Sequence, residues 1–216
     1  MITKKIKPEF MSQYLYAIFH FQFQNLQNQK IMKRTIVLIP LLLLFFAQGI
    51  QAQKYFTREG KITFVSDAAM EKIEAVTNSA TSVIDMATGA VEFAVLIKGF
   101  QFKKALMQEH FNENYMESSK FPKATFKGKI DNFSSVNLKK DGTYPVTTKG
   151  KLTIHGVTKD VDLKGQFVVK GGAISGTSTF NLAVADYDIK IPSVVKDNVA
   201  KVVKVDVSCN YQEFNK

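Results

Sequence analysis

The chain has 216 residues, the length of one domain with an appendage. Its hydrophobic fraction of 45% excludes a disordered chain, and its single cysteine excludes an internal disulfide and a cysteine-rich zinc site. The formal net charge is +10, but residues 53–216 hold 23 Lys and Arg against 18 Asp and Glu, a net charge of +5. Because these lysines are scattered rather than gathered in a block, the charge does not indicate a nucleic-acid partner.

Residues 32–52 have the layout of a secretory signal peptide. A short basic stretch at Met32-Lys33-Arg34 precedes the apolar run 35–47, and Ala52 ends the segment. The apolar run is shorter than the roughly 20 residues of a transmembrane helix. We therefore expect cleavage near Ala52 and a periplasmic or secreted mature chain of residues 53–216, with a retained membrane anchor as the alternative.

Residues 1–31 do not resemble the basic start of a signal peptide. Residues 19–25 are aromatic and rich in Gln. We interpret 1–31 as an upstream extension that is not part of the fold, with Met32 as the true start. The alternative is a genuine N-terminal tail.

Beyond Gln53, apolar and polar residues alternate with a period of two, which is typical of β-strands. The pattern predicts strands within residues 61–66, 71–79, 82–86 and 90–98. Thr88-Gly89 predicts a turn before the last of these. In that strand, four apolar residues share a face opposite Glu92 and Lys98: Val91, Phe93, Val95 and Ile97.

Residues 103–118 interrupt the alternation and predict one helix. Apolar and aromatic residues recur there at roughly helical spacing: Leu106, Met107, His110, Phe111 and Met116. Pro122 follows shortly afterwards, as is common beyond the end of a helix.

The strand pattern resumes at Lys123 and continues almost to the end of the chain. Turns are predicted at Asp141-Gly142, His155-Gly156 and Gly171-Gly172, the first of them as a hairpin between two strands. The residues expected on the inner face are Phe126, Gly128, Ile130, Val146, Thr148, Gly150, Leu152, Ile154, Val161, Leu163, Gly165, Phe167, Val169, Ile174, Gly176, Ser178, Phe180, Leu182, Val184, Val203, Val205, Val207, Cys209 and Tyr211.

About eight strands with hairpin-length connections and one helix predict an all-β fold. A single antiparallel sheet with one apolar face leaves exposed edges, and closure into a barrel removes them. The expected architecture is an extended eight-stranded antiparallel β-barrel, whose interior is filled by side chains or holds one small ligand. Four glycines on the inner face permit tight coiling or bulges, or leave space for a ligand: Gly128, Gly150, Gly165 and Gly176.

Two motifs carry a resemblance to a known family. The stretch 150–161 reads GKLTIHGVTKDV, and the stretch 120–126 reads KFPKATF and follows the expected helix with its Glu109-His110-Phe111. Both resemble the YceI-like, lipid- or polyisoprenoid-binding family, over roughly residues 55–212. The resemblance implies a lipocalin-like barrel outside the cytoplasm that carries an isoprenoid quinone or a similar amphiphilic lipid. It implies neither an enzyme nor a metal or other cofactor, and it allows a homodimer.

From the alternation we predict that nine inward side chains contact such a ligand. They are Phe93, Val95, Phe126, Ile130, Leu152, Phe167, Phe180, Val205 and Val207. The driving force would be transfer of an apolar chain out of water, at about 0.8 kcal/mol for each buried methylene group.

Two alternative functions stay open at this stage. A hydrolase or isomerase would use His155 as a general base, which requires that its side chain open into the cavity; otherwise His155 shapes its turn through backbone hydrogen bonds. A barrel with a filled core would instead act through its surface, as an envelope stress or interaction module.

Other candidate residues have structural interpretations that we favour. His110 beside Glu109 is more consistent with helix packing than with a metal site, and Cys209 on the inner face is more consistent with an inert buried thiol than with redox chemistry. Asp186 and Asp188 are interpreted as carboxylates of a solvated loop. Four outward lysines provide solubility and edge protection, or attract anionic head groups: Lys127, Lys129, Lys149 and Lys151.

Overall fold

The computed structural model describes His20, Gln24 and residues 53–214. The interpretations of residues 1–31 and 32–52 fall outside these described residues. Contacts divide the chain into Met1–Gln51 and Ala52–Lys216, and every strand of the described residues lies in the second unit. In the part of the chain that the structure describes, no helix is long and apolar enough to cross a membrane.

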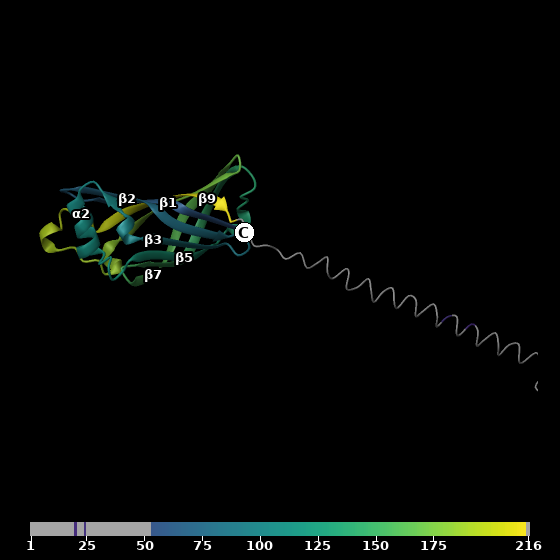
Figure 1. The fold of residues 1–216 in the computed structure, drawn as a ribbon, viewed down its shortest axis with the longest axis horizontal. Helices are drawn as coiled ribbons and strands as arrows, with labels where there is room; N and C mark the ends of the chain where they lie inside the picture. Colours follow the sequence, from purple (N-terminus) through teal and green to yellow (C-terminus); the bar gives the residue numbers. More distant parts are fainter. Residues whose placement is uncertain (1–19, 21–23, 25–52, 215–216) are drawn as a thin grey trace, which may run out of the picture. The chain divides into compact units, whose positions relative to one another are not determined.

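Eight antiparallel strands close into a barrel, as the alternation predicts (Figure 1). Around the barrel the strands follow the order β1-β9-β8-β7-β6-β5-β3-β2, and pairing of β2 with β1 closes the sheet. A ninth strand, β4, has two residues and pairs only with β2. The strands are β1 (Lys54–Asp67), β2 (Lys72–Asp85), β3 (Ala90–Leu96), β4 (Gln101–Phe102), β5 (Lys123–Ile130), β6 (Gly142–Ile154), β7 (Val157–Lys170), β8 (Ala173–Ala183) and β9 (Val202–Glu213).

The connections at the two ends of the barrel differ in length. One end, here the helix end, carries residues 68–71, 97–122, 155–156 and 184–201. The opposite end, here the far end, carries residues 86–89, 131–141 and 171–172, together with the end of β9 (Figure 1). Two of the helix-end connections are long, so most of the irregular structure gathers at this one end.

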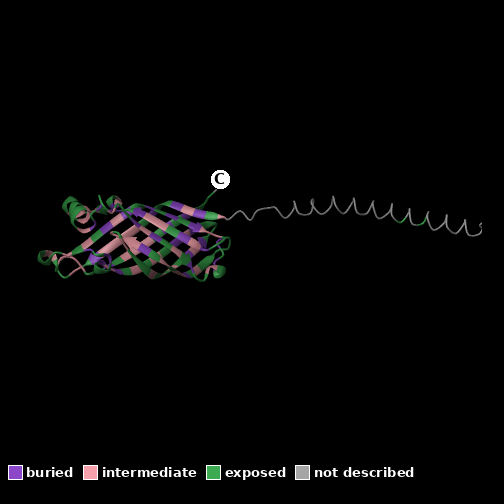
Figure 2. Ribbon diagram, turned by 90° about the horizontal axis from the view of Figure 1, so that it is seen from below, coloured by how far each residue is buried: buried purple, intermediate pink, exposed green. Residues whose placement is uncertain are grey.

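Burial alternates along the strands as the period of two requires (Figure 2). In β5, for example, Ala124, Phe126 and Ile130 are buried, whereas Lys127 and Lys129 are exposed. The buried side chains form one core cluster inside the barrel. The barrel unit thus has a closed sheet and its own core, which are the conditions for independent folding.

The predicted helix is present but shorter and more irregular than expected. The α-helix α2 spans Ala105–His110, and a π-helix, η2, continues it over Phe111–Tyr115. No residue of α2 is buried, and Leu106 is 60% exposed. The apolar residues of α2 itself are therefore not buried, whereas Phe111 and Met116 of the predicted set, beyond the end of α2, pack against or within the core cluster.

Two of the predicted strand assignments differ from the structure. The strands predicted at 71–79 and 82–86 are one long strand, β2 (Lys72–Asp85), which pairs with β1 across register shifts on either side of Gly60. The strand predicted over 90–98 ends at Leu96, and a 3₁₀-helix, η1 (Ile97–Gly99), follows it.

The hairpin predicted at Asp141-Gly142 is wrong. The connection from β5 to β6 covers residues 131–141 and includes a 3₁₀-helix, η3 (Phe133–Ser135), because Val136 and Leu138 of this connection are buried in the core cluster. Both carboxylate oxygens of Asp141 instead accept the N–H of Gly171 at 3.0 Å, which joins two far-end connections.

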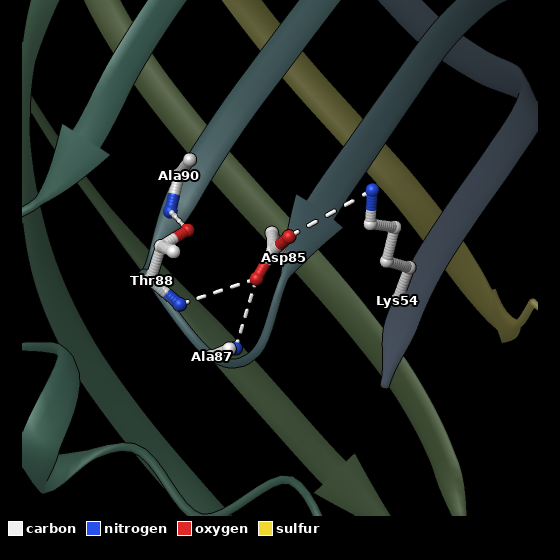
Figure 3. A network of polar contacts seen from close by, with 5 residues as sticks. All are labelled: Lys54, Asp85, Ala87, Thr88 and Ala90. Atoms are coloured by element: carbon white, nitrogen blue, oxygen red, sulfur yellow. Dashed lines mark hydrogen bonds and ion pairs between the residues drawn. The ribbon is translucent and has the colours of Figure 1, made fainter. Parts of the chain in front are cut away.

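The turn from β2 to β3 is held by Asp85 (Figure 3). Its Oδ1 accepts the N–H groups of Ala87 at 2.9 Å and Thr88 at 3.1 Å, and Lys54 Nζ lies 3.8 Å from Oδ2. Burial raises the pKa of this carboxyl, but the Ala87 and Thr88 hydrogen bonds and the Lys54 charge lower it more, so the pKa lies below its usual value. The ionised carboxylate therefore caps the turn at neutral pH.

Two of the inner-face glycines serve close approach of strands. Gly128 of β5 lies opposite Gly150 of β6. A Cβ on Gly150 would lie 2.4 Å from the Lys127 carbonyl oxygen and 2.8 Å from the ring of Phe126. The Phe126 ring therefore occupies the space above this pair. At these two positions the glycines allow the strands to coil tightly, and they do not leave space for a ligand.

Candidate ligand-binding cavity

A cavity of about 460 Å³ lies inside the barrel, so the sheet does not close on a filled core. All eight strands of the closed barrel contribute to its wall. The volume falls within the range of about 300–1,000 Å³ that is usual for small-molecule sites. Most of the wall is aliphatic or aromatic, so the cavity suits an apolar ligand.

The structure places all nine predicted contact residues on the cavity wall. Five of them are buried within the wall: Val95, Phe126, Ile130, Leu152 and Phe167. The other four keep accessible surface: Phe93, Phe180, Val205 and Val207. That these side chains contact a ligand stays a prediction, and the four partly exposed ones are its strongest members.

Cross-strand pairing organises the accessible wall into rows. Phe180, Val205 and Phe64 are paired neighbours across β8, β9 and β1. Val207 pairs with Ser178 on one side and with Ile62 on the other. Side chains in such rows meet across neighbouring strands, so the wall is a continuous surface along which an extended chain can lie.

The cavity opens at the helix end. Its wall includes Glu71, Met107, Ile191 and Val195, which belong to three helix-end connections. Among the described residues, none of the far-end connections 86–89, 131–141 and 171–172 contributes to the wall. We call the three connections 68–71, 97–122 and 184–201 the mouth.

Four phenylalanine rings link the mouth to the barrel wall. Phe64 of β1 lies 5.5 Å from Phe100, 5.9 Å from Phe102 and 5.4 Å from Phe111 between ring centroids. Phe111 in turn lies 5.8 Å from Phe100 and 5.0 Å from Phe102. We call this set the aromatic cluster; it holds η2 against the barrel, and all four rings line the cavity.

The sequence prediction did not include the mouth residues among the ligand contacts. Period-two alternation selects strand residues only, whereas Phe100, Phe111, Met107 and Val195 lie outside the barrel strands. The sequence does carry one indication of these contacts: segments 97–116 and 189–199 contain more apolar residues than is usual for loops exposed to solvent.

A hydrogen-bonded polar pair lies at the cavity wall, which Tyr211 lines and Ser82 does not. The hydroxyl groups of Ser82 and Tyr211 share a hydrogen bond of 2.9 Å, and both residues are buried. Burial raises the pKa of the Tyr211 hydroxyl well above its usual value. The Tyr211 hydroxyl is therefore uncharged near neutral pH and is hydrogen-bonded to Ser82.

Cys209 is buried, as predicted, with a side chain 1% exposed. Burial raises the pKa of its thiol to about 11. Because only the thiolate is nucleophilic, this cysteine is inert in the folded protein near neutral pH.

His155 is a structural residue of the helix end and does not line the cavity. It has a φ of 50° and Gly156 a φ of 77°, as a tight hairpin turn with two left-handed residues requires. Its Nδ1 donates to the Tyr187 carbonyl oxygen at 3.2 Å, and its Nε2 lies 3.6 Å from Oε1 of Glu117. The condition that the hydrolase hypothesis sets for His155 is therefore not met.

Replacing His155 with alanine should lower the free energy of unfolding by about 2 kcal/mol. The Tyr187 carbonyl oxygen loses its hydrogen-bond donor, and the ring contact with Phe121, at 4.6 Å between centroids, is removed. Urea unfolding of His155→Ala measures the change. His110→Ala is the matched control: His110 is exposed, and its replacement should change stability by less than about 0.5 kcal/mol. Equal losses of stability in the two variants would contradict the structural role of His155.

The remaining polar candidates form no catalytic or metal-binding arrangement. His110 is exposed on α2 at the mouth, and Asp186 and Asp188 are exposed in the 184–201 connection. Within the described residues, no group of three His, Cys, Asp or Glu side chains could hold a metal ion.

Three of the four outward lysines form ion pairs on the barrel surface. Lys149 lies 2.9 Å from Asp131, Lys151 lies 2.9 Å from Asp160, and Lys127 lies 3.6 Å from Glu92. These contacts support the interpretation of the lysines as solubilising surface residues, because paired charges attract anions weakly.

Comparisons with known proteins agree with this geometry. A family model described as the YceI-like domain matches residues 54–211. The curated proteins give no match. Among solved structures, a polyisoprenoid binding domain from Saccharophagus degradans implicated in plant cell wall breakdown is 15% identical, with a TM-score of 0.65; the match covers 75% of this chain and 99% of that one.

A second solved structure, BcnA from Burkholderia cenocepacia, is 16% identical with a TM-score of 0.58. That match covers 71% of this chain and 96% of BcnA. At such low identity, the two structural likenesses show a shared fold.

Proposed function

Because the chain belongs to the YceI-like family, we propose that it is a binding protein that holds the apolar chain of an isoprenoid or similar amphiphilic lipid inside the barrel. The observation that carries the proposal is the apolar cavity of about 460 Å³, which opens at one end. The fold is shared with a domain whose description names polyisoprenoid binding. An isoprenoid quinone fits this chemistry, since its tail is apolar and its ring could remain near the polar residues of the mouth.

A binding role is favoured over an enzymatic one. His155 hydrogen-bonds a backbone carbonyl outside the cavity wall, and among the described residues no hydrogen bond joins a hydroxyl of the wall to a histidine or a carboxylate. Hydrophobic transfer of the chain into the cavity supplies the affinity, at about 0.8 kcal/mol per buried methylene group.

We also propose that the protein acts in the periplasm or outside the cell. The basic stretch, apolar run and Ala52 of residues 32–52 support this location. The intact mass of the protein purified from a secreting host tests it, because cleavage after Ala52 gives a chain that begins at Gln53. A mass that includes residues 32–52 would contradict it.

Native mass spectrometry of the secreted protein is the experiment that tests ligand binding. We expect a lipid of near-stoichiometric amount to accompany the protein, and solvent extraction identifies its class. A bare protein that also fails to take up an added isoprenoid quinone would overturn the proposal. The same spectra give the oligomeric state and so test the proposed homodimer.

Filling part of the cavity should weaken ligand uptake. Thr148 lines the cavity. Its replacement with tryptophan adds a side-chain volume larger than that of three methylene groups of a bound lipid chain. Displacing that length of chain should weaken ligand binding by at least about fiftyfold. Thr143→Trp is the matched control, since Thr143 is exposed on the same strand and should bind as the unmodified protein does. Equal binding by both variants would place the ligand outside the cavity.

A further inference from the structure

The exposed apolar side chains of the barrel unit gather at its helix end. Of the seven large hydrophobic residues that are exposed, five lie in the helix-end connections or at the strand ends beside them: Met70, Leu96, Leu106, Val194 and Val202. The most exposed are Val194 at 88%, Met70 at 74% and Leu106 at 60%, one in each connection of the mouth. Exposure of this extent at one end is not explained by the folding of the barrel.

Each of these three residues stands directly beside the entrance of the cavity. The next residue in the chain lines the cavity in every case: Glu71 after Met70, Met107 after Leu106 and Val195 after Val194. The three exposed side chains therefore mark the outer edge of the same opening. We call Met70, Leu106 and Val194 the lip.

Contacts between the connections hold the lip together. The Met70 N–H donates to the Asp197 carbonyl oxygen at 3.0 Å, which joins the β1–β2 turn to the β8–β9 connection. Lys104 Nζ lies 3.1 Å from Oε1 of Glu71, which joins the helix segment to the same turn. The three connections that carry the lip residues are thus joined to one another by these contacts.

Lysines accompany the lip at a constant distance in sequence. Lys72 and Lys196 lie two residues from Met70 and Val194, respectively, and both are exposed. Lys104 lies two residues from Leu106, but its ammonium group is paired with Glu71. Apolar tips flanked by long cationic side chains suit a bilayer surface, where the tips enter the acyl region and the ammonium groups remain among anionic head groups.

We propose that the lip docks the open end of the barrel on the surface of a lipid bilayer containing anionic phospholipid. A protein partner would require a continuous complementary patch, whereas a fluid bilayer accommodates separate apolar tips around an opening. Docking in this orientation also places the cavity entrance against the bilayer, which would be the source of an apolar lipid chain. The proposal goes beyond ligand binding, and it can fail or hold independently of it.

Vesicle sedimentation tests the docking with the Gln53–Lys216 protein, because the barrel unit has a closed sheet and its own core. The vesicles contain phosphatidylcholine alone or mixed with phosphatidylglycerol. We expect binding to the mixed vesicles, reduced at least about tenfold in the triple variant M70S/L106S/V194S. The matched control is V83S/F214S, which changes the two exposed apolar residues outside the helix end and should bind like the unmodified protein.

A second measurement uses the absence of tryptophan from the chain. Leu106→Trp provides a single fluorophore at the lip, and its emission should shift to shorter wavelength when mixed vesicles are added. Val83→Trp, on the outer wall, should show no shift. Vesicle binding that persists in Thr148→Trp separates docking from occupancy of the cavity.

Three results would overturn the proposal: no binding of the unmodified protein to mixed vesicles, equal binding by the triple variant, or equal loss in the control. If the unmodified protein instead forms a dimer that M70S/L106S/V194S disrupts, and it does not bind vesicles, the lip is an interface with a second copy and the proposal is wrong.

Discussion

Replacing Gly150 with alanine should lower the free energy of unfolding by about 3 kcal/mol. The added Cβ would lie 2.4 Å from the Lys127 carbonyl oxygen and 2.5 Å from the Cα of Gly128. Both atoms belong to the backbone of β5, so the contact cannot be relieved by rotating a side chain. The strands must separate, which weakens the pairing of β5 with β6 and displaces the Phe126 ring that lies above the two glycines.

Urea unfolding followed by circular dichroism measures this change. Gly142→Ala is the matched control, because Gly142 is an exposed residue of the same strand and its nearest neighbour is the end of the Tyr144 side chain at 3.2 Å. We expect a midpoint close to that of the unmodified protein for the control. A Gly150→Ala variant as stable as the control would show that the pair tolerates a side chain and that the glycines are there to leave ligand space.

The inner wall could be predicted from the sequence because a strand presents alternate residues to opposite faces. This regularity is sufficient to place Phe93, Phe180 and Val207 on the cavity wall. It does not distinguish a side chain that borders open cavity from one packed within the wall. Ile130 follows the same alternation as Val207, yet it is 1% exposed, because the difference depends on how the opposite wall is filled.

The mispredicted segments share a physical cause: long-range contacts override local signals. Asp141-Gly142 has the composition of a tight turn, but burial of Val136 and Leu138 makes the preceding connection part of the core. The two strands predicted at 71–79 and 82–86 form one strand, because register shifts on either side of Gly60 change the phase of the alternation between Thr77 and Ser82. Neither the buried connection nor the paired partner strand is visible in a local window of sequence.

The mouth was harder to predict for the same reason. Its residues come from three connections far apart in the sequence, and their proximity follows from closure of the barrel. Only the closed barrel brings Met107 and Val195 to one opening. The sequence shows that these connections are apolar, but it does not show that they surround a cavity entrance.

Replacing Phe64 with alanine should lower the free energy of unfolding by about 3 kcal/mol, at the lower end of the range for loss of a core phenylalanine. Phe64 is partly exposed to the cavity, which reduces the loss. It nevertheless contacts Phe100, Phe102 and Phe111, and it is the ring of β1 through which the barrel wall holds the π-helix η2. Its removal therefore weakens the attachment of the mouth as well as the core.

Two measurements distinguish these consequences. Urea unfolding gives the global loss, and amide hydrogen exchange reports local opening, which we expect to increase over residues 105–118 more than over β6 and β7. Phe56→Ala is the matched control: Phe56 lies on the same strand and contacts Phe214 near the exposed C-terminal end, so it should cost only about 1 kcal/mol and leave exchange at the mouth unchanged. If Phe64→Ala increases exchange evenly over the barrel, the aromatic cluster is part of the general core and does not specifically hold the entrance.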